Sequence, residues 1–170
     1  MLLQPLSFDA SQSMLFPVFH NGGTLHLVSW INSLNPEALA SYIESHSIDY
    51  LKIAPVHLAS LLKQNPTASF LPKVGLIMGG EAMPVSLVKA IARFNSSCKI
   101  LNHYGPTETT VGVLVENVDF GEYENGASLS SVPLGRPLAN VCAHILNTSG
   151  ELQAIGVEGE LCIGGEAVTR

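Results

Sequence analysis

Apolar positions in the first two thirds of the chain switch repeatedly between a helical spacing and short unbroken runs. In the stretch 36–47, Leu39 and Ile43 fall on one helical face. Asn35 precedes this face as a potential cap, and Pro36 occupies the first turn. The whole pattern predicts helices over 36–47, from Pro55 to the Asn65-Pro66 stop and from Pro84 onward, and strands over 49–53, 73–78 and 98–104.

Helices that alternate with short apolar strands predict consecutive right-handed βαβ units. The expected fold class is therefore α/β, with a mainly parallel sheet and flanking helices. Ligands of such sheets bind beyond the carboxyl ends of the strands. Lys52, Gly79-Gly80 and His103-Tyr104 stand at the ends of successive predicted strands. We therefore expect them to line one edge of the sheet.

The pattern changes after residue 120, so 1–120 is expected to form the α/β part of the chain. Residues 121–134 are largely polar and contain several glycines and serines, which predicts a surface loop. Beyond them, short β runs occur over 141–146 and 160–163. Residues 135–170 are therefore predicted to begin a separate β subdomain.

Composition narrows the possible functions. The net charge of −6 argues against a nucleic-acid partner, which would need a basic surface. No run of about 18 apolar residues predicts a membrane span, and the start does not resemble a signal peptide. Cys98, Cys142 and Cys162 are scattered, which is typical of small buried residues in a reducing compartment. We therefore expect a cytoplasmic protein without a membrane partner.

One string of nine residues, from Asn102 to Thr110, carries most of the chemical information. It offers an aromatic face at Tyr104, a hydroxyl at Thr107 and an acid at Glu108. These groups suit a base, a phosphate and a hard cation, because Mg²⁺ usually takes one or two protein carboxylates plus phosphate oxygens. The alternative is a tight turn with a capping threonine and a solvated glutamate, which suits an arbitrary Gly-Pro turn. A string this long and specific favours the first interpretation.

The string resembles the NxYGPTE signature of the adenylation domains of nonribosomal peptide synthetases, which belong to the adenylate-forming, AMP-binding enzyme superfamily. Three further stretches match motifs of the same family in the right order: residues 7–11 resemble FDxS, 79–82 GGEA and 159–165 GELxIxG. The four motifs span nearly the whole chain. The resemblance implies that 135–170 begin the distorted barrel subdomain of these enzymes. It also implies a partial domain, because Arg170 ends the sequence inside a motif.

The resemblance further implies an activity. In this family an amino-acid carboxylate attacks the α-phosphate of ATP in the presence of Mg²⁺, and the amino acid then passes to a carrier-protein thiol. Thr107 matches the residue that contacts the α-phosphate and Glu108 matches the Mg²⁺ ligand, so both are candidate catalytic residues. For Glu81 a structural or solvated role is the alternative. The nucleotide-binding positions carried over are Gly79, Gly80, Glu81, Ala82, Asn102, Tyr104 and Thr107.

An amino-acid pocket is implied in the same way. Asp9 matches the residue that binds the substrate's α-ammonium, and its alternative role is to cap the helix that follows. Lys52 and His103 match two wall positions. A cationic lysine beside a histidine favours a short acidic side chain, because charge-assisted hydrogen bonds to a carboxylate are strong. The alternative for Lys52 is a solvated lysine at the sheet margin. The remaining wall positions are Ala10, Ser13, Ile77, Gly79, Val111 and Gly112.

This pocket is similar to that of aspartate-activating domains, so the expected substrate is L-aspartate or a β-substituted aspartate. Ala10 and Ser13 depart from the usual pattern and leave the β-substituent open. The expected partners are the peptidyl carrier protein and condensation domain of one assembly line. Family parts expected before Asp9 and after Arg170 are missing, which predicts that these 170 residues alone do not form the adenylate. Two alternatives stay open: an acyl-CoA or aryl-acid ligase, and a noncatalytic specificity or interaction module.

Overall fold

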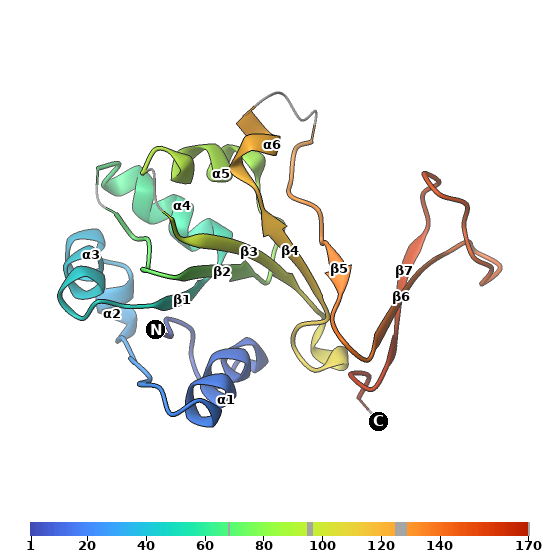
Figure 1. Cartoon of the computed structure of the whole chain (residues 1–170), viewed down its shortest axis with the longest axis horizontal. Coiled ribbons are helices and arrows are strands. Elements are labelled where there is room, and N and C mark those ends of the chain that lie inside the picture. Colours follow the sequence, from blue (N-terminus) through green and yellow to red (C-terminus); the bar gives the residue numbers. More distant parts are fainter. Residues whose placement is uncertain (68, 95–96, 125–128, 170) are drawn as a thin grey trace.

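Five strands form a mixed sheet in the order β1-β2-β3-β4-β5 (Figure 1). The computed structural model describes residues 1–67, 69–94, 97–124 and 129–169. β1, β2 and β3 pair in parallel, whereas β4 runs antiparallel to β3 and β5 antiparallel to β4. The α/β fold is therefore confirmed, with its parallel part formed by the three strands that the apolar runs predict. The strands are β1 (Tyr50–Ile53), β2 (Gly75–Gly79), β3 (Lys99–Tyr104), β4 (Leu114–Val118) and β5 (Arg136–Pro137).

The three predicted helices are present as α3 (Pro36–Ser45), α4 (Pro55–Gln64) and α5 (Val85–Ala92). Proline occupies the first turn of α3 and of α4, where its missing N–H removes no helical hydrogen bond. The side chain of Asn35 accepts a hydrogen bond from the backbone N–H of Ala38 at 2.9 Å. Asn35 therefore caps α3, as its position before Pro36 predicts.

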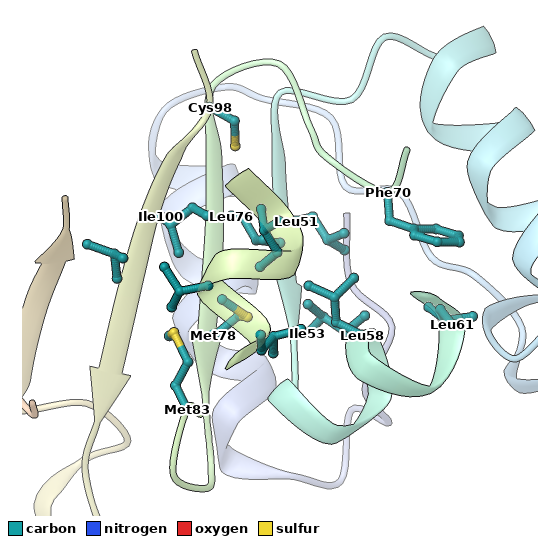
Figure 2. Packing of buried hydrophobic residues seen from close by; sticks show 14 of the residues in the cluster. Leu51, Ile53, Leu58, Leu61, Phe70, Leu76, Met78, Met83, Cys98 and Ile100 are labelled. Carbon is teal, nitrogen blue, oxygen red and sulfur yellow. The ribbon is translucent and has the colours of Figure 1, made fainter. Parts of the chain in front are cut away.

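Helices α4 and α5 cover one face of the sheet and form the core with it (Figure 2). Leu51 and Ile53 of β1 and Leu76 and Met78 of β2 all point into this layer and are fully buried. Burying each such side chain stabilises the fold by roughly 1.5–3 kcal/mol. A slip of β1 by one residue would turn Leu51 and Ile53 to the other face, so the core also fixes the register of β1 on β2.

The opposite face of the sheet carries α1 (Gln12–His20), which follows the 3₁₀ turn η1 (Asp9–Ser11) (Figure 1). Residues that alternate with the core positions point to this side. Lys52 pairs with Ile77 in the sheet register, and His103 follows two residues after the partner of Ile77 on β3. The sheet thereby presents three of the predicted pocket residues on one face.

The segment after β3 departs from its local β propensity. The β-prone run 109–115 is not extended throughout, because the 3₁₀ turn η2 (Thr107–Thr109) overlaps its start. Thr110 and Val111 then adopt positive φ values of 59° and 73°. This reversal turns the chain back, so that β4 begins only at Leu114 and runs antiparallel along β3.

The predicted surface loop over 121–134 is also only partly a loop. Helix α6 (Phe120–Glu124) overlaps its start. Tyr123 and Val132 are both buried in the core, so these two apolar side chains anchor a segment whose composition is otherwise polar. Residues 125–128 of the predicted loop lie outside the described residues.

The last part of the chain forms an antiparallel hairpin of β6 (Val141–Leu146) and β7 (Glu160–Gly165), which lies apart from the five-stranded sheet (Figure 1). Both strands occur where the pattern predicts them. A short helix, α2 (Trp30–Ser33), follows α1 and has no counterpart in the prediction. Within the described residues, no helix has both the length and the apolar character needed to cross a membrane.

Candidate functional site

A cleft of ≈ 920 Å³ opens at the carboxyl ends of β1, β2 and β3. Its walls come from η1, the strand ends, the start of α4 and the turn after β3. This is the edge at which parallel strands of α/β sheets bind their ligands. The predicted site residues that line the cleft are Asp9, Ala10, Lys52, Gly79, Gly80, Glu81, His103, Thr107 and Val111.

Lys52 places its ammonium group in a buried position: the residue is only 2% exposed. Its Nζ donates hydrogen bonds to the carbonyl oxygen of Ala10 at 3.0 Å and to Oγ of Ser13 at 2.5 Å. Burial lowers the pKa of Lys52 to about 8, and the negative charge of Asp9 partly opposes this shift. Lys52 is therefore not a solvated lysine at the sheet margin. An ammonium has three N–H donors, so these two bonds leave one for a ligand.

Asp9 brings the opposite charge to the same cleft. Its Oδ1 accepts a hydrogen bond from the backbone N–H of Ala10 at 2.6 Å, within the 3₁₀ turn that precedes α1. The N-cap position of α1 belongs to Ser11, so Asp9 is not the cap of that helix. A carboxylate in this place suits a ligand cation such as an ammonium group.

Two glycines make room for His103. A Cβ on Gly79 would lie 2.1 Å from the carbonyl oxygen of His103, and a Cβ on Gly112 would lie 1.9 Å from its ring atoms Cε1 and Nε2. Burial, and then the charge of Lys52, lower the pKa of His103 to about 4. The imidazole is therefore neutral at pH 7, with one nitrogen that donates a hydrogen bond and one that accepts.

The turn after β3 is held in a strained shape. A Cβ on Gly105 would lie 2.3 Å from the carbonyl oxygen of Val111, so the chain crosses itself closely here. The positive φ values of Thr110 and Val111 cost of order 1–3 kcal/mol each and persist only where the surroundings enforce them. The segment after β7 helps to hold the turn in this shape. The backbone N–H and the Oγ1 hydroxyl of Thr169 both donate hydrogen bonds to the carbonyl oxygen of Glu108, at 2.8 Å and 2.9 Å.

The side chains of Thr107 and Glu108 are exposed at this turn. In the part of the chain that the structure describes, no three His, Cys, Asp or Glu side chains gather into a metal site. A single carboxylate fits Mg²⁺, which keeps several waters and takes phosphate oxygens from a nucleotide. It does not fit a structural zinc ion, which needs four protein ligands.

Residues predicted to meet the nucleotide divide between the two faces of the sheet. Gly80 has a φ of 91° and open space beside its Cα, so a planar ligand could approach the backbone closely. Glu81 Oε1 accepts a hydrogen bond from the backbone N–H of Val56 at 2.7 Å and thereby caps the start of α4, which is the structural alternative. Asn102 points to the core face, is 3% exposed and donates to the carbonyl oxygen of Pro133 at 2.8 Å. The structure therefore does not bring the Asn102 amide into the cleft.

Several other predicted residues also stand outside the cleft lining. Ser13 and Ile77 line a second cavity of ≈ 800 Å³, and Gly112 packs against the ring of His103. Trp30 and His57, by contrast, line the cleft with rings 6.3 Å apart and belong to no motif, so no sequence signal points to them. The predicted residues outside the lining are Ser13, Ile77, Ala82, Asn102, Tyr104, Glu108 and Gly112.

Comparison with known proteins gives a consistent result. A family model described as AMP-binding enzyme matches residues 1–170, the whole chain. Surfactin synthase subunit 2 of Bacillus subtilis (strain 168) is 35% identical over 99% of this chain. Bacitracin synthase 1 of Bacillus licheniformis is 32% identical over 99% of it. The chain spans only 5% and 3% of the lengths of these two relatives.

Solved structures share the fold. A four-domain nonribosomal peptide synthetase bound to AMP and glycine superposes with a TM-score of 0.81 at 29% identity, covering 95% of this chain and 11% of that one. A synthetase protein that contains adenylation and PCP domains gives a TM-score of 0.82 at 24% identity, covering 97% of this chain and 32% of that one. The second likeness supports the fold alone.

Proposed function

The chain belongs to the AMP-binding enzyme family, and on that premise we propose that it is the part of a nonribosomal peptide synthetase adenylation domain that selects the amino acid. The proposed substrate is L-aspartate or a β-substituted aspartate, activated with ATP to aminoacyl-AMP. In this proposal residues 1–120 supply the α/β part of the site, and 135–170 begin the β subdomain. The proposed partners are the peptidyl carrier protein that receives the amino acid and the condensation domain of the same assembly line.

The buried Lys52 carries the proposal. A cation that is 2% exposed is costly unless an anion compensates it, and its two hydrogen-bond acceptors are uncharged. Asp9 offsets part of this cost through its charge. A ligand with an ammonium for Asp9 and a side-chain carboxylate for Lys52 would match both charges of the cleft. Aspartate has these two groups, and the neutral imidazole of His103 adds a hydrogen-bond donor for the same carboxylate.

The proposed reaction joins this ligand to a nucleotide. An oxygen of the α-carboxylate forms a bond to the α-phosphorus of ATP, and the bond from that phosphorus to the pyrophosphate oxygen breaks. Asp9, Lys52 and His103 hold the amino acid so that its α-carboxylate faces the turn after β3. Thr107 supplies a hydroxyl for the α-phosphate, and Glu108 would hold Mg²⁺, which neutralises phosphate charge when bound. Positioning and charge neutralisation of this kind account for most of the catalysis in phosphoryl chemistry.

Exchange of pyrophosphate into ATP by the complete synthetase tests the proposal. Replacing Lys52 with Met keeps most of the length of the side chain but removes the cation. Loss of one charge-assisted hydrogen bond, about 1.5–3 kcal/mol, should lower kcat/KM for aspartate roughly 10- to 150-fold. Asp9→Asn should weaken exchange with every amino acid, since it acts on the α-ammonium.

Other results would point to other functions. An acyl-CoA or aryl-acid ligase has no use for a carboxylate at Asp9, so Asp9→Asn would leave its exchange with an aryl or acyl acid unchanged. A noncatalytic module would show no exchange with any acid. Either result contradicts the proposed function.

A further inference from the structure

We propose that Ser13 is a positioning residue for the acidic side chain of the substrate: its hydroxyl orients the Lys52 ammonium toward the cleft and does not itself contact the substrate. This inference rests on the proposed function for the identity of the ligand. It assigns Ser13 a different role from the pocket-wall position that the motif match implies.

The hydrogen bonds around Lys52 form a closed triangle. Ser13 Oγ donates to the carbonyl oxygen of Ala10 at 2.8 Å, so its lone pairs are free to accept the bond from Lys52 Nζ at 2.5 Å. The same Ala10 oxygen accepts a second bond from Nζ at 3.0 Å. Two acceptors on the α1 side fix the direction of the ammonium, and its third N–H is left for a ligand.

Ser13 and Lys52 meet different cavities. Lys52 lines the cleft that also contains Asp9 and His103, whereas Ser13 lines the second cavity. This geometry therefore argues against direct contact between Ser13 and a substrate in the cleft. A hydroxyl that is bonded to the lysine from behind can affect the substrate only through the lysine.

The alternative role for Ser13 is an ordinary helical hydrogen bond. Serine near a helix start often donates to a carbonyl three residues earlier, and Ser45 makes such a bond to Tyr42 at 3.3 Å at the exposed end of α3. Ser45 therefore serves as a matched control: its back-bond has the same spacing but no buried lysine accompanies it. Removing the Ser45 hydroxyl should have no effect on substrate selection.

Three variants of the complete synthetase test the proposal by pyrophosphate exchange. Ser13→Ala should raise KM for aspartate about 5- to 30-fold, the range expected when one or two hydrogen bonds of ordinary strength are lost. The change in kcat should be smaller. Ser13→Thr keeps the hydroxyl and can place its methyl group in the second cavity, so it should restore the wild-type KM. Ser45→Ala should match the wild type.

A second readout does not depend on turnover. The rate at which an acylating reagent labels Lys52, followed by mass spectrometry as a function of pH, reports the titration of its ammonium. Two titratable groups face that ammonium, Asp9 from η1 and His103 from β3. Loss of the Ser13 acceptor destabilises the charged form, so Ser13→Ala should shift the labelling curve to lower pH, and Ser13→Thr should not.

The two readouts separate failure of this inference from failure of the proposed function. An unchanged aspartate KM together with an unchanged labelling curve in Ser13→Ala would overturn the positioning role. A shifted labelling curve in an enzyme that exchanges only with neutral amino acids would leave Ser13 holding Lys52 but would contradict the acidic substrate. A raised KM that Ser13→Thr does not rescue would indicate direct contact with the substrate and also overturn the inference.

Discussion

The contact between Gly112 and His103 allows a sharp test of the pocket. Replacing Gly112 with Ala would put a methyl group 1.9 Å from Cε1 and Nε2 of the imidazole. An ordinary contact between such atoms is about 3.5 Å, so the ring must retreat by roughly 1.5 Å. The clash involves the end of a side chain rather than backbone, so we expect His103 to move while the fold persists.

The size of the effect follows from the proposed hydrogen bond between the His103 ring and the substrate's side-chain carboxylate, which this movement would break. An N–H···O bond operates over about 2.7–3.2 Å, so a shift of roughly 1.5 Å abolishes it. A hydrogen bond to a charged group contributes about 1.5–3 kcal/mol. Gly112→Ala should therefore lower kcat/KM for aspartate roughly 10- to 150-fold in pyrophosphate exchange. KM for ATP should change little, because the proposed function assigns the displaced ring to the amino acid and not to the nucleotide.

A double-mutant cycle isolates the cause. In a His103→Ala background the added methyl group has no ring to displace, so Gly112→Ala should cost nothing further. Gly164→Ala is the matched control, since its Cβ would lie 3.9 Å from the nearest side-chain atom, an ordinary contact. The reasoning would be refuted if Gly112→Ala weakened aspartate equally with and without the His103 ring.

Three further outcomes follow from the same geometry. The pKa of Lys52 is lowered from 10.5 to about 8, so its side chain is fully charged well below pH 8 and loses its charge as the pH rises through 8. KM for aspartate should rise over that pH window, whereas KM for ATP should stay constant. Gly79→Ala would place Cβ 2.1 Å from the backbone oxygen of His103, which cannot rotate away. The free energy of unfolding, measured with denaturant, should therefore fall by about 1–3 kcal/mol or more. Unchanged stability would contradict the close approach. Glu108→Gln should raise the Mg²⁺ concentration needed for half-maximal exchange without changing KM for aspartate; an unchanged Mg²⁺ requirement would remove Glu108 as the metal ligand.

Much of the fold could be predicted because its signals are local. Pro36 and Asn35 mark the start of α3, and the apolar runs mark β1 to β3 to within a few residues. The edge that gathers Lys52, Gly79 and His103 follows from strand order and the alternation of side chains, and the structure places all three in the cleft lining.

Other features depend on contacts between residues that are distant in sequence. Thr110 and Val111 are β-prone residues, yet the close approach at Gly105 and the bonds from Thr169 hold this segment in a tight turn. Tyr123 enters the core from a polar stretch because tertiary packing outweighs local composition.

The functional side chains show the same limit. A motif match gives a residue but not the direction in which it points. Asn102 belongs to the most informative string in the sequence, but strand alternation turns its amide to the core face, where Pro133 accepts its hydrogen bond. Ser13 likewise shares a motif-derived pocket with Lys52 but stands behind it. The alternation of side chains along β3 predicts the direction of the Asn102 amide, whereas the place of Ser13 behind Lys52 depends on α1 and β1 being brought together by the fold.

The most direct measurement is ATP–pyrophosphate exchange by the complete wild-type synthetase with aspartate, β-methylaspartate, asparagine, glutamate and leucine in parallel. The buried cation at Lys52, in the same cleft as the carboxylate of Asp9, predicts that aspartate or its β-substituted form gives the highest kcat/KM, with asparagine and leucine far below. Exchange driven by leucine or asparagine instead would contradict an acidic substrate, although the chain would remain a member of the AMP-binding enzyme family.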